Sequence, residues 1–190
     1  MPTSIKYVDL FCGMGSFHYA FQKLGFECVM ASDISKSARI NYDKNYNTTV
    51  LGDITVSDPA SIREYDILCA GFPFQGFSRI GIHQGFDNQS SGLLWEIMKF
   101  IKCNEPKVVV LENVCALLKH NDGESFKQVI DELKYNDYDV IYKVLKCSDY
   151  GLPQMRRRLF IVGVKKDLNV NLSNFFDFDE YKTNITLNEF

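Results

Sequence analysis

The chain has 190 residues, of which 46% are apolar and 24% are charged, and its formal net charge is −3. These proportions are typical of a globular domain and exclude an intrinsically disordered chain. The slight negative charge excludes a strongly basic surface, so any nucleic-acid partner must be recognised by local groups of residues. No apolar run is long enough to cross a membrane and no secretory signal is visible, so we expect no membrane partner and a cytoplasmic location (nuclear in a eukaryote).

Short apolar or β-branched runs alternate with segments of helical periodicity, which is typical of an α/β domain with a mostly parallel sheet. The spacing of apolar residues predicts helices over Ser16–Leu24, around Leu94–Ile101 and around Phe126–Leu133. Seven strands are predicted: Ile5–Phe11, Phe26–Ala31, Thr48–Leu51, Asp66–Ala70, Lys107–Leu111, Val140–Leu145 and Leu159–Val164. Because the periodicity ends there, we predict a domain over residues 1–166 and a linker-like tail over residues 167–190.

The six cysteines do not form the spaced pairs that hold zinc or build a disulfide framework. Five of the six lie in apolar or strand-like stretches, and the full set is Cys12, Cys28, Cys69, Cys103, Cys115 and Cys147. We therefore expect reduced thiols that pack as small hydrophobic side chains, and no metal site.

The turn after the first predicted strand has features of a nucleotide-binding turn. Gly13 and Gly15 would let the backbone pass close to a ligand and direct the N-terminus of the next helix toward it. The next two strands end at Asp33 and Asp53, at the sheet edge where open α/β folds bind ligands and hold ribose hydroxyls. Spacing alone leaves open whether this is an ordinary turn and whether both aspartates are only helix N-caps.

Further segments follow in a recognisable order. Residues 71–78 read Gly-Phe-Pro-Phe-Gln-Gly-Phe-Ser, residues 111–114 read Leu-Glu-Asn-Val, and residues 149–158 contain Gln-Met-Arg-Arg-Arg. With the opening Asp9–Phe17 stretch, this series resembles the cytosine-5 DNA methyltransferases, which transfer a methyl group from S-adenosylmethionine to carbon 5 of cytosine. The resemblance covers residues 5 to about 165. It implies a Rossmann-like methyltransferase fold, with a mostly parallel sheet of about seven strands and helices on both faces.

The resemblance also implies a reaction. In the family, a cysteine thiolate adds to carbon 6 of a cytosine flipped out of the duplex, and carbon 5 then attacks the sulfonium methyl group. Glu112 would contact ring nitrogen 3 and the exocyclic amine of the base. Arg158 and Arg156 would hold the carbonyl oxygen of the base and a phosphate.

For the cofactor, the resemblance implies that S-adenosylmethionine, and S-adenosylhomocysteine after transfer, binds beside the glycine turn. Phe11 would stack on the adenine, Asp33 would hold the ribose hydroxyls, and Asp53 would contact the adenine amine. The further positions implied to line this site are Gly13, Gly15, Ile34, Ile54, Pro73 and Leu94.

The sequence departs from the family at the nucleophile, because that position holds Phe74. A phenyl ring has no lone pair or ionisable group to add to carbon 6, so the chain as written is predicted to be inactive through this residue. Cys69 lies inside a strand and is predicted to be a core residue. Cys147 is the other cysteine that could lie near the base pocket.

Residues 79–91 are rich in glycine and polar side chains, where the family has a loop that closes over DNA. The family's target-recognition domain and last two motifs have no counterpart in the 190 residues. Two interpretations remain open. The chain could be part of a split restriction-modification methyltransferase that acts on double-stranded DNA with a second subunit. Alternatively, it could be a catalytically dead module that binds S-adenosylmethionine, DNA or a partner methyltransferase.

Overall fold

The structure is a computed structural model that describes residues 4–62, 64–73, 92–178 and 181–183. The chain divides into two units, residues 1–111 and 112–190, and each is described by itself. The predicted loop at residues 79–91 and Phe74 lie outside the described residues.

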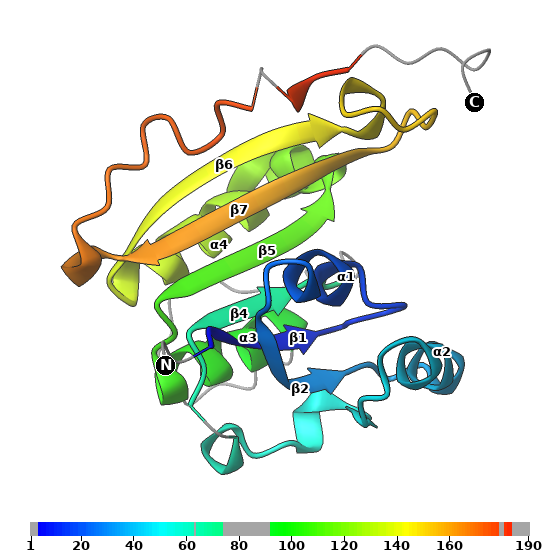
Figure 1. Ribbon diagram of the computed structural model, residues 1–190. Helices are drawn as coiled ribbons and strands as arrows, with labels where there is room; N and C mark the ends of the chain where they lie inside the picture. The colour runs from blue at the N-terminus through cyan, green and yellow to red at the C-terminus, as the bar shows by residue number, and fades with distance from the viewer. Residues whose placement is uncertain (1–3, 63, 74–91, 179–180, 184–190) are drawn as a thin grey trace. The chain divides into compact units, whose positions relative to one another are not determined.

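The first unit is built on parallel strands in the order β3-β2-β1-β4-β5 (Figure 1). The strands pair along mostly apolar runs, such as Tyr7–Leu10 on β1, in which Asp9 is the one charged residue, against Ile67–Ala70 on β4. The bounds are β1 Lys6–Leu10, β2 Glu27–Ser32, β3 Val50–Leu51, β4 Ile67–Ala70 and β5 Val108–Val114, of which the first unit holds the part through Leu111. Because the strands are parallel, their carboxyl ends meet at one edge of the sheet.

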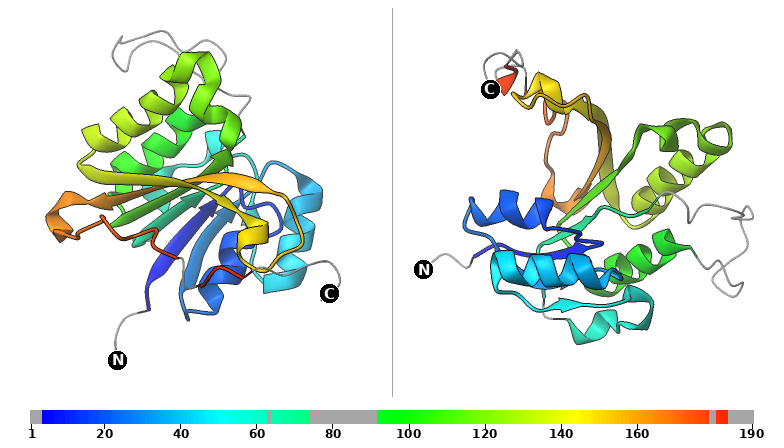
Figure 2. Two further views of the ribbon diagram at one scale, coloured as in Figure 1. Left: turned by 90° about the horizontal axis from the view of Figure 1, so that it is seen from above. Right: turned by 90° about the vertical axis from the view of Figure 1, so that its right-hand side faces the viewer.

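Helices cover both faces of this sheet (Figure 2). The helices α1 (Ser16–Gln22) and α2 (Lys36–Tyr46) lie on one face, and α3 (Leu93–Asn104) lies on the other. Right-handed crossovers explain this arrangement, because the chain reverses its direction across the sheet after β3. Two short 3₁₀ helices, η1 (Ile54–Val56) and η2 (Pro59–Ser61), pack against α3.

The core of the first unit lies between the sheet and its helices. It is built from side chains that the apolar spacing of the strands and of α3 directs inward. The largest fully buried members are Tyr7, Leu10, Tyr42, Leu68, Ile97, Met98, Phe100, Ile101 and Leu111.

The second unit begins with the end of β5 at Glu112 and contains an antiparallel pair, β6 (Tyr138–Lys146) and β7 (Arg157–Lys165). The helix α4 (Glu124–Tyr135) follows the 3₁₀ segment η4 (Cys115–Gly123) and packs against β6. Phe126 of α4 meets Tyr142 of β6 edge to face, with ring centroids 4.7 Å apart. Two more 3₁₀ turns flank β7, at η5 (Cys147–Asp149) and η6 (Lys166–Leu168).

The segment after β7 contacts the rest of the second unit, although its sequence has no periodicity that predicts such contacts. The Lys143 ammonium donates to the Phe176 carbonyl oxygen at 2.6 Å, and Phe176 is buried. Further along, the Thr183 amide donates to the Asp149 carbonyl oxygen at 2.9 Å. The predicted boundary between residues 166 and 167 stays a prediction.

The predicted architecture is confirmed, since the described residues contain seven strands in the order β3-β2-β1-β4-β5-β7-β6, with an antiparallel pair at the end. Three of the strands are longer than predicted: β5 continues to Val114, and β6 and β7 each extend at both ends. The helix α2 was not predicted, because its sequence is polar and carries little apolar periodicity. Among the described helices, none has the length and apolar character to cross a membrane.

Candidate functional site

The glycine turn after β1 faces open space. Gly13 and Gly15 have positive φ angles of 54° and 89°, and Phe11 also adopts a left-handed conformation, with φ 57°. The Gly13 amide donates to Oδ2 of Asp33 at 2.9 Å, which ties the turn to the end of β2. A Cβ atom at Gly13 would meet no atom within 4 Å, so the outer side of the turn has room for a ligand.

The inner side of the turn is held by Tyr46, which the sequence analysis missed along with α2. Its hydroxyl donates to the Gly15 carbonyl oxygen at 2.9 Å, and its ring stacks on His18 with centroids 4.0 Å apart. A Cβ atom at Gly15 would overlap with the Tyr46 ring. The only available signal was the spacing of Tyr42 and Tyr46, which are four residues apart and therefore on the same side of a helix.

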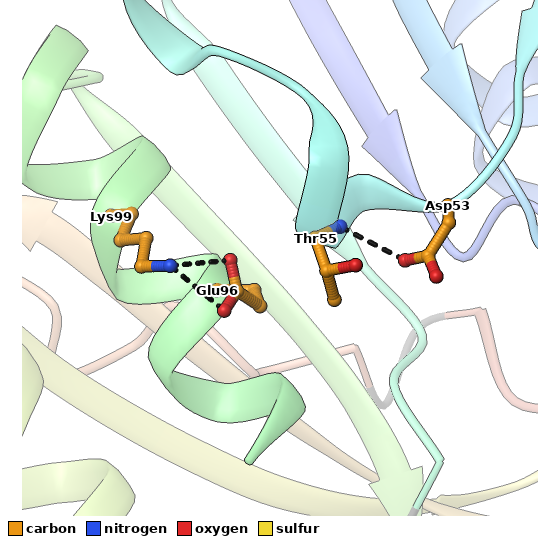
Figure 3. Close-up of polar contacts among 4 residues, drawn as sticks. All are labelled: Asp53, Thr55, Glu96 and Lys99. Carbon is orange, nitrogen blue, oxygen red and sulfur yellow. Dashed lines mark hydrogen bonds and ion pairs between the residues drawn. The ribbon is translucent and has the colours of Figure 1, made fainter. Parts of the chain in front are cut away.

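The two predicted acidic residues lie at the carboxyl edge of the sheet but differ in their roles there. Asp33 accepts the Gly13 amide on one oxygen and the Ser35 amide, at 2.8 Å, on the other. Ser35 is the N-cap of α2, so the N-cap alternative is wrong for Asp33. It is confirmed for Asp53, which caps η1 by accepting the Thr55 amide at 2.9 Å (Figure 3).

The carboxylate of Asp53 is held by the backbone of its own turn and not by the lysine on the neighbouring helix. Lys99 of α3 donates to both carboxylate oxygens of Glu96, each at 2.9 Å (Figure 3). The basic side chain is thus turned toward its own helix, and the negative charge of Asp53 is free to interact with a hydrogen-bond donor of a ligand.

The remaining predicted cofactor positions differ in exposure. Ile34 is 74% exposed, and Pro73 is also exposed, so both side chains are accessible to a ligand. Ile54 and Leu94 are only 3% and 2% exposed, so their side chains belong to the core and only their backbone atoms could contact one. The structure therefore gathers Phe11, Gly13, Asp33 and Asp53 at one sheet edge, while their contacts with a cofactor stay predictions.

A buried acid lies beneath this edge. Asp9 of β1 is fully buried, receives a 3.5 Å hydrogen bond from the Tyr42 hydroxyl on one oxygen, and has no partner among the described residues on the other. Burial raises the pKa of the Asp9 carboxyl to about 7; the Tyr42 hydrogen bond opposes the rise and the charge of Asp33 adds to it. Tyr42 also bonds with Nδ1 of His18 at 2.7 Å, and burial lowers the pKa of that imidazole.

The second unit brings together three of the predicted catalytic residues. Oε1 of Glu112, on β5, accepts from Nε of Arg158, on β7, at 2.8 Å, and lies 3.6 Å from Nη2 of Arg156. Glu112 and Arg158 are about one-quarter exposed, whereas Arg156 is 48% exposed. This arrangement presents a carboxylate and two guanidinium groups to solvent on one side of the strands. Such a set can bind a polar ring edge and an adjacent anion.

The expected packing of the cysteines is found only in part, because two of the six are buried, three are half-buried and one is exposed. All six are free thiols; Cys69 is fully buried in β4 and is confirmed as a core residue, whereas Cys103 is exposed. Cys147 is half-buried, and its amide donates to the Arg156 carbonyl oxygen at 2.9 Å. No group of His, Cys, Asp and Glu suited to a metal occurs among the described residues. The role of Phe74 stays a prediction.

Comparison with known proteins decides the family. The model of the C-5 cytosine-specific DNA methylase family matches residues 5–189. The chain belongs to the C-5 cytosine-specific DNA methylase family. The type II methyltransferase M.BsuFI of Bacillus subtilis is 37% identical over 90% of this chain, which covers 42% of that protein. M.HhaI of Haemophilus parahaemolyticus is 36% identical over 91% of the chain and 53% of that protein.

Solved structures show the same fold. A mutant of DNMT2 from Spodoptera frugiperda superposes with a TM-score of 0.71 at 22% identity, over 90% of this chain and 53% of that one. A TehB-like SAM-dependent methyltransferase from Corynebacterium glutamicum superposes with a TM-score of 0.53 at 16% identity, over 87% of this chain and 82% of that one. The chain spans about half the length of the curated relatives it matches.

Proposed function

We propose that this chain is the cofactor-binding and base-binding part of a DNA cytosine-5 methyltransferase. The observation that carries the proposal is the contact of Glu112 with Arg158 at 2.8 Å, with Arg156 beside them. Arg156 and Arg158 lie 44 and 46 positions after Glu112 in the sequence, and the family resemblance assigns Glu112 and Arg158 to the base and Arg156 to a phosphate. Their meeting on neighbouring strands supports a site for a flipped cytosine.

The sheet edge of the first unit fits S-adenosylmethionine, which supplies an electrophilic methyl group when bound. The space outside Gly13 leaves room for the amino-acid end, and Asp33 is held in place by two backbone amides. Its carboxylate oxygens retain lone pairs for the ribose hydroxyls. Phe11 offers a ring for stacking on the adenine, and Asp53 an acceptor for the adenine amine.

In the second unit, the residues would hold and polarise the base. The Glu112 carboxyl group would bind ring nitrogen 3 and the exocyclic amine, which stabilises the ring when carbon 6 is attacked. Arg158 orients that carboxyl group through its Nε–H and would hold the base carbonyl oxygen. The distance from Arg156 to Glu112 is longer than that from Arg158, and the Arg156 side chain is more exposed. Arg156 therefore fits a neighbouring phosphate of the flipped nucleotide.

Phe74 limits what the chain does with a bound cytosine, because its ring cannot supply the thiolate that attacks carbon 6. We infer that the chain with Phe74 binds the cofactor and double-stranded DNA without methylating through this residue. A second polypeptide segment would supply target recognition. Phe74 also favours the alternative function, a catalytically inactive module that binds the cofactor, DNA or a partner methyltransferase.

Cofactor binding is tested by titration calorimetry with S-adenosylhomocysteine. We expect Asp33→Ala to weaken binding at least severalfold, because it removes the ribose acceptor and loosens the Gly13 turn. Asp58→Ala is the matched control, since Asp58, like Asp33, accepts the backbone amide of the residue two positions later but is no predicted cofactor ligand. Equal effects of the two substitutions, or no binding by the unmodified chain, would contradict the assignment.

The chemistry is tested by covalent trapping on duplex DNA that contains 5-fluorocytosine, with recognition supplied by a complementary segment of a relative. The Phe74 chain should form no adduct, and Phe74→Cys should restore trapping if the base site is intact. Restored trapping supports a lost nucleophile in an otherwise complete pocket, and its failure supports the binding-module alternative. An adduct of the Phe74 chain that disappears in Cys147→Ser would overturn the assignment of an empty nucleophile position.

A further inference from the structure

The last residue pair of the β6–β7 ladder, Lys146 and Arg157, places two cations directly opposite each other, and we call this pair the Lys146–Arg157 rung. Lys146 of β6 pairs with Arg157 of β7 in the antiparallel register, and the Cys147 amide continues the ladder by donating to the Arg156 carbonyl oxygen. Side chains at directly opposed positions have Cβ atoms about 4.5–5.5 Å apart, and like charges there destabilise the pair. Lys146 and Arg157 therefore repel each other, and a neutral or acidic residue at either position would remove this repulsion.

These two cations are not the ones that bind Glu112. Successive residues of a strand point to opposite faces, so Arg157 lies on the face of β7 opposite to Arg158. Lys146 shares that face with Tyr142, which is four residues earlier and contacts α4. The rung thus lies on the α4 face of the β6–β7 pair, beyond the level at which Phe126 packs.

The charge of this rung is poorly compensated. Arg157 is exposed and has no ion pair within the part of the chain that the structure describes. Lys146 has one acidic neighbour, Asp149, at 3.8 Å, and the side chains of this pair are 34% and 44% exposed. One distant carboxylate therefore faces two cations, whereas on the other side Glu112 is in direct contact with Arg158.

We propose that the Lys146–Arg157 rung is a binding site for a backbone phosphate of the DNA. This inference rests on the proposed function, since it takes duplex DNA as the substrate. The opposed side chains are close enough for both to reach one phosphodiester group, and such a group would relieve the repulsion between them. The contact positions the duplex without reading its sequence, and it adds a second anchor to the one at the flipped nucleotide.

The test is Arg157→Glu, which converts the repulsive rung into an ion pair. The substitution should weaken binding of duplex DNA about threefold to tenfold and reduce the slope of log affinity against log salt by about one unit. At the same time, it should raise the melting temperature by roughly 1–3 °C. A merely structural role of Arg157 would not give opposite signs for binding and stability.

The matched control is Lys127→Glu, which makes the same change of net charge at an exposed position of α4. Fluorescence anisotropy is measured for both variants at low and moderate salt, on duplexes with and without a cytosine at the target position. A loss of DNA affinity in Arg157→Glu that is larger than in the control, and equal on both duplexes, supports a phosphate contact. Losses equal to those of the control overturn the inference alone, whereas absence of DNA binding by the unmodified chain overturns the proposed function as well.

Discussion

Gly15 lies against the ring of Tyr46, which supports the glycine turn. Comparing Gly15 with Gly25 separates the cost of backbone strain from the cost of displacing that ring. Gly25 also has a positive φ, of 74°, but a Cβ there would meet nothing within 4 Å. Gly25→Ala should therefore cost only the backbone strain, about 1–2 kcal/mol of unfolding free energy. Gly15→Ala should cost about 1–3 kcal/mol more, because the new methyl group displaces the Tyr46 ring. Denaturant unfolding compares the two variants, and equal losses would mean that Tyr46 yields without cost.

Tyr46→Phe isolates the hydrogen bond from the stacking. The ring can remain on His18, while the bond to the Gly15 carbonyl is lost, so we expect about 1 kcal/mol of destabilisation. Binding of S-adenosylhomocysteine should weaken about twofold to fivefold because the turn becomes less fixed. Tyr142→Phe, on a partly exposed tyrosine of the second unit, is the control and should leave binding unchanged. Unaltered binding by Tyr46→Phe would show that the turn keeps its shape without this donor.

Asp9 makes the stability of the chain depend on pH. Its folded-state pKa of about 7 lies above the unfolded value near 3.8, so between these values the folded state binds the proton more strongly. The stabilisation from the protonated acid is complete below the lower pKa and is lost as the pH rises through 7, at up to about 1.4 kcal/mol per pH unit. Asp9→Asn should gain stability relative to the unmodified chain when both are measured at pH 8 rather than pH 5. A difference that does not vary with pH would show that Asp9 is ionised throughout.

At the scale of elements, α2 determines whether Asp33 and Tyr46 reach the turn, because both flank or belong to this helix. Its N-cap, Ser35, accepts the Ala38 amide at 3.4 Å. Ser35→Ala should cost about 1 kcal/mol and lower cofactor affinity, since the end of the helix frays next to Asp33. Lys36→Ala, at an exposed position of the first turn, leaves the hydroxyl of the cap in place and should have a smaller effect in thermal unfolding and calorimetry. The reverse order would contradict the role of the cap.

The elements that were predictable from sequence are those whose burial leaves a pattern. Runs of apolar residues identify the strands, and the apolar stripe of α3 at Leu94, Ile97 and Ile101 identifies that helix. By contrast, α2 is mostly polar and depends on its capping and on two aromatic side chains, which no periodicity reveals. The extension of β5 to Val114 was also missed, because Glu112 and Asn113 interrupt the apolar run although they continue the strand.

The candidate site was predictable only in part. The glycine turn and the residues Glu112, Arg156 and Arg158 were predicted from segments that resemble those of the family. The structure shows that Glu112, Arg156 and Arg158 lie together. The support by Tyr46 and the opposed cations Lys146 and Arg157 depend on a helix position and on strand register. Such pairings link residues that are distant along the chain, and composition or spacing alone does not determine them.

For the whole molecule, the low net charge and the exposed apolar residues near the turn predict association. Met14 lies in the turn and Ile34 follows Asp33, and their side chains are 70% and 74% exposed. Light scattering should show concentration-dependent self-association, which a Met14→Gln, Ile34→Gln double variant reduces. Leu168→Gln, at an exposed apolar residue of the second unit, is the control and should not reduce it. A chain that stays monomeric at high concentration would contradict an uncovered apolar surface.

The position of Glu112 inside a strand limits how this region can vary in length. Within β5 the buried residues alternate with half-buried ones, and Glu112 falls on the half-buried side with Val110 and Val114. Inserting or deleting one residue between Leu111 and Glu112 would turn the carboxylate to the opposite side, while two residues would restore its direction. Insertions here should therefore be absent, because even two residues would move the carboxylate about 6.6 Å along the strand and away from Arg158. The loop before β7 can change length as long as Arg156 and Arg158 keep their positions beside Glu112.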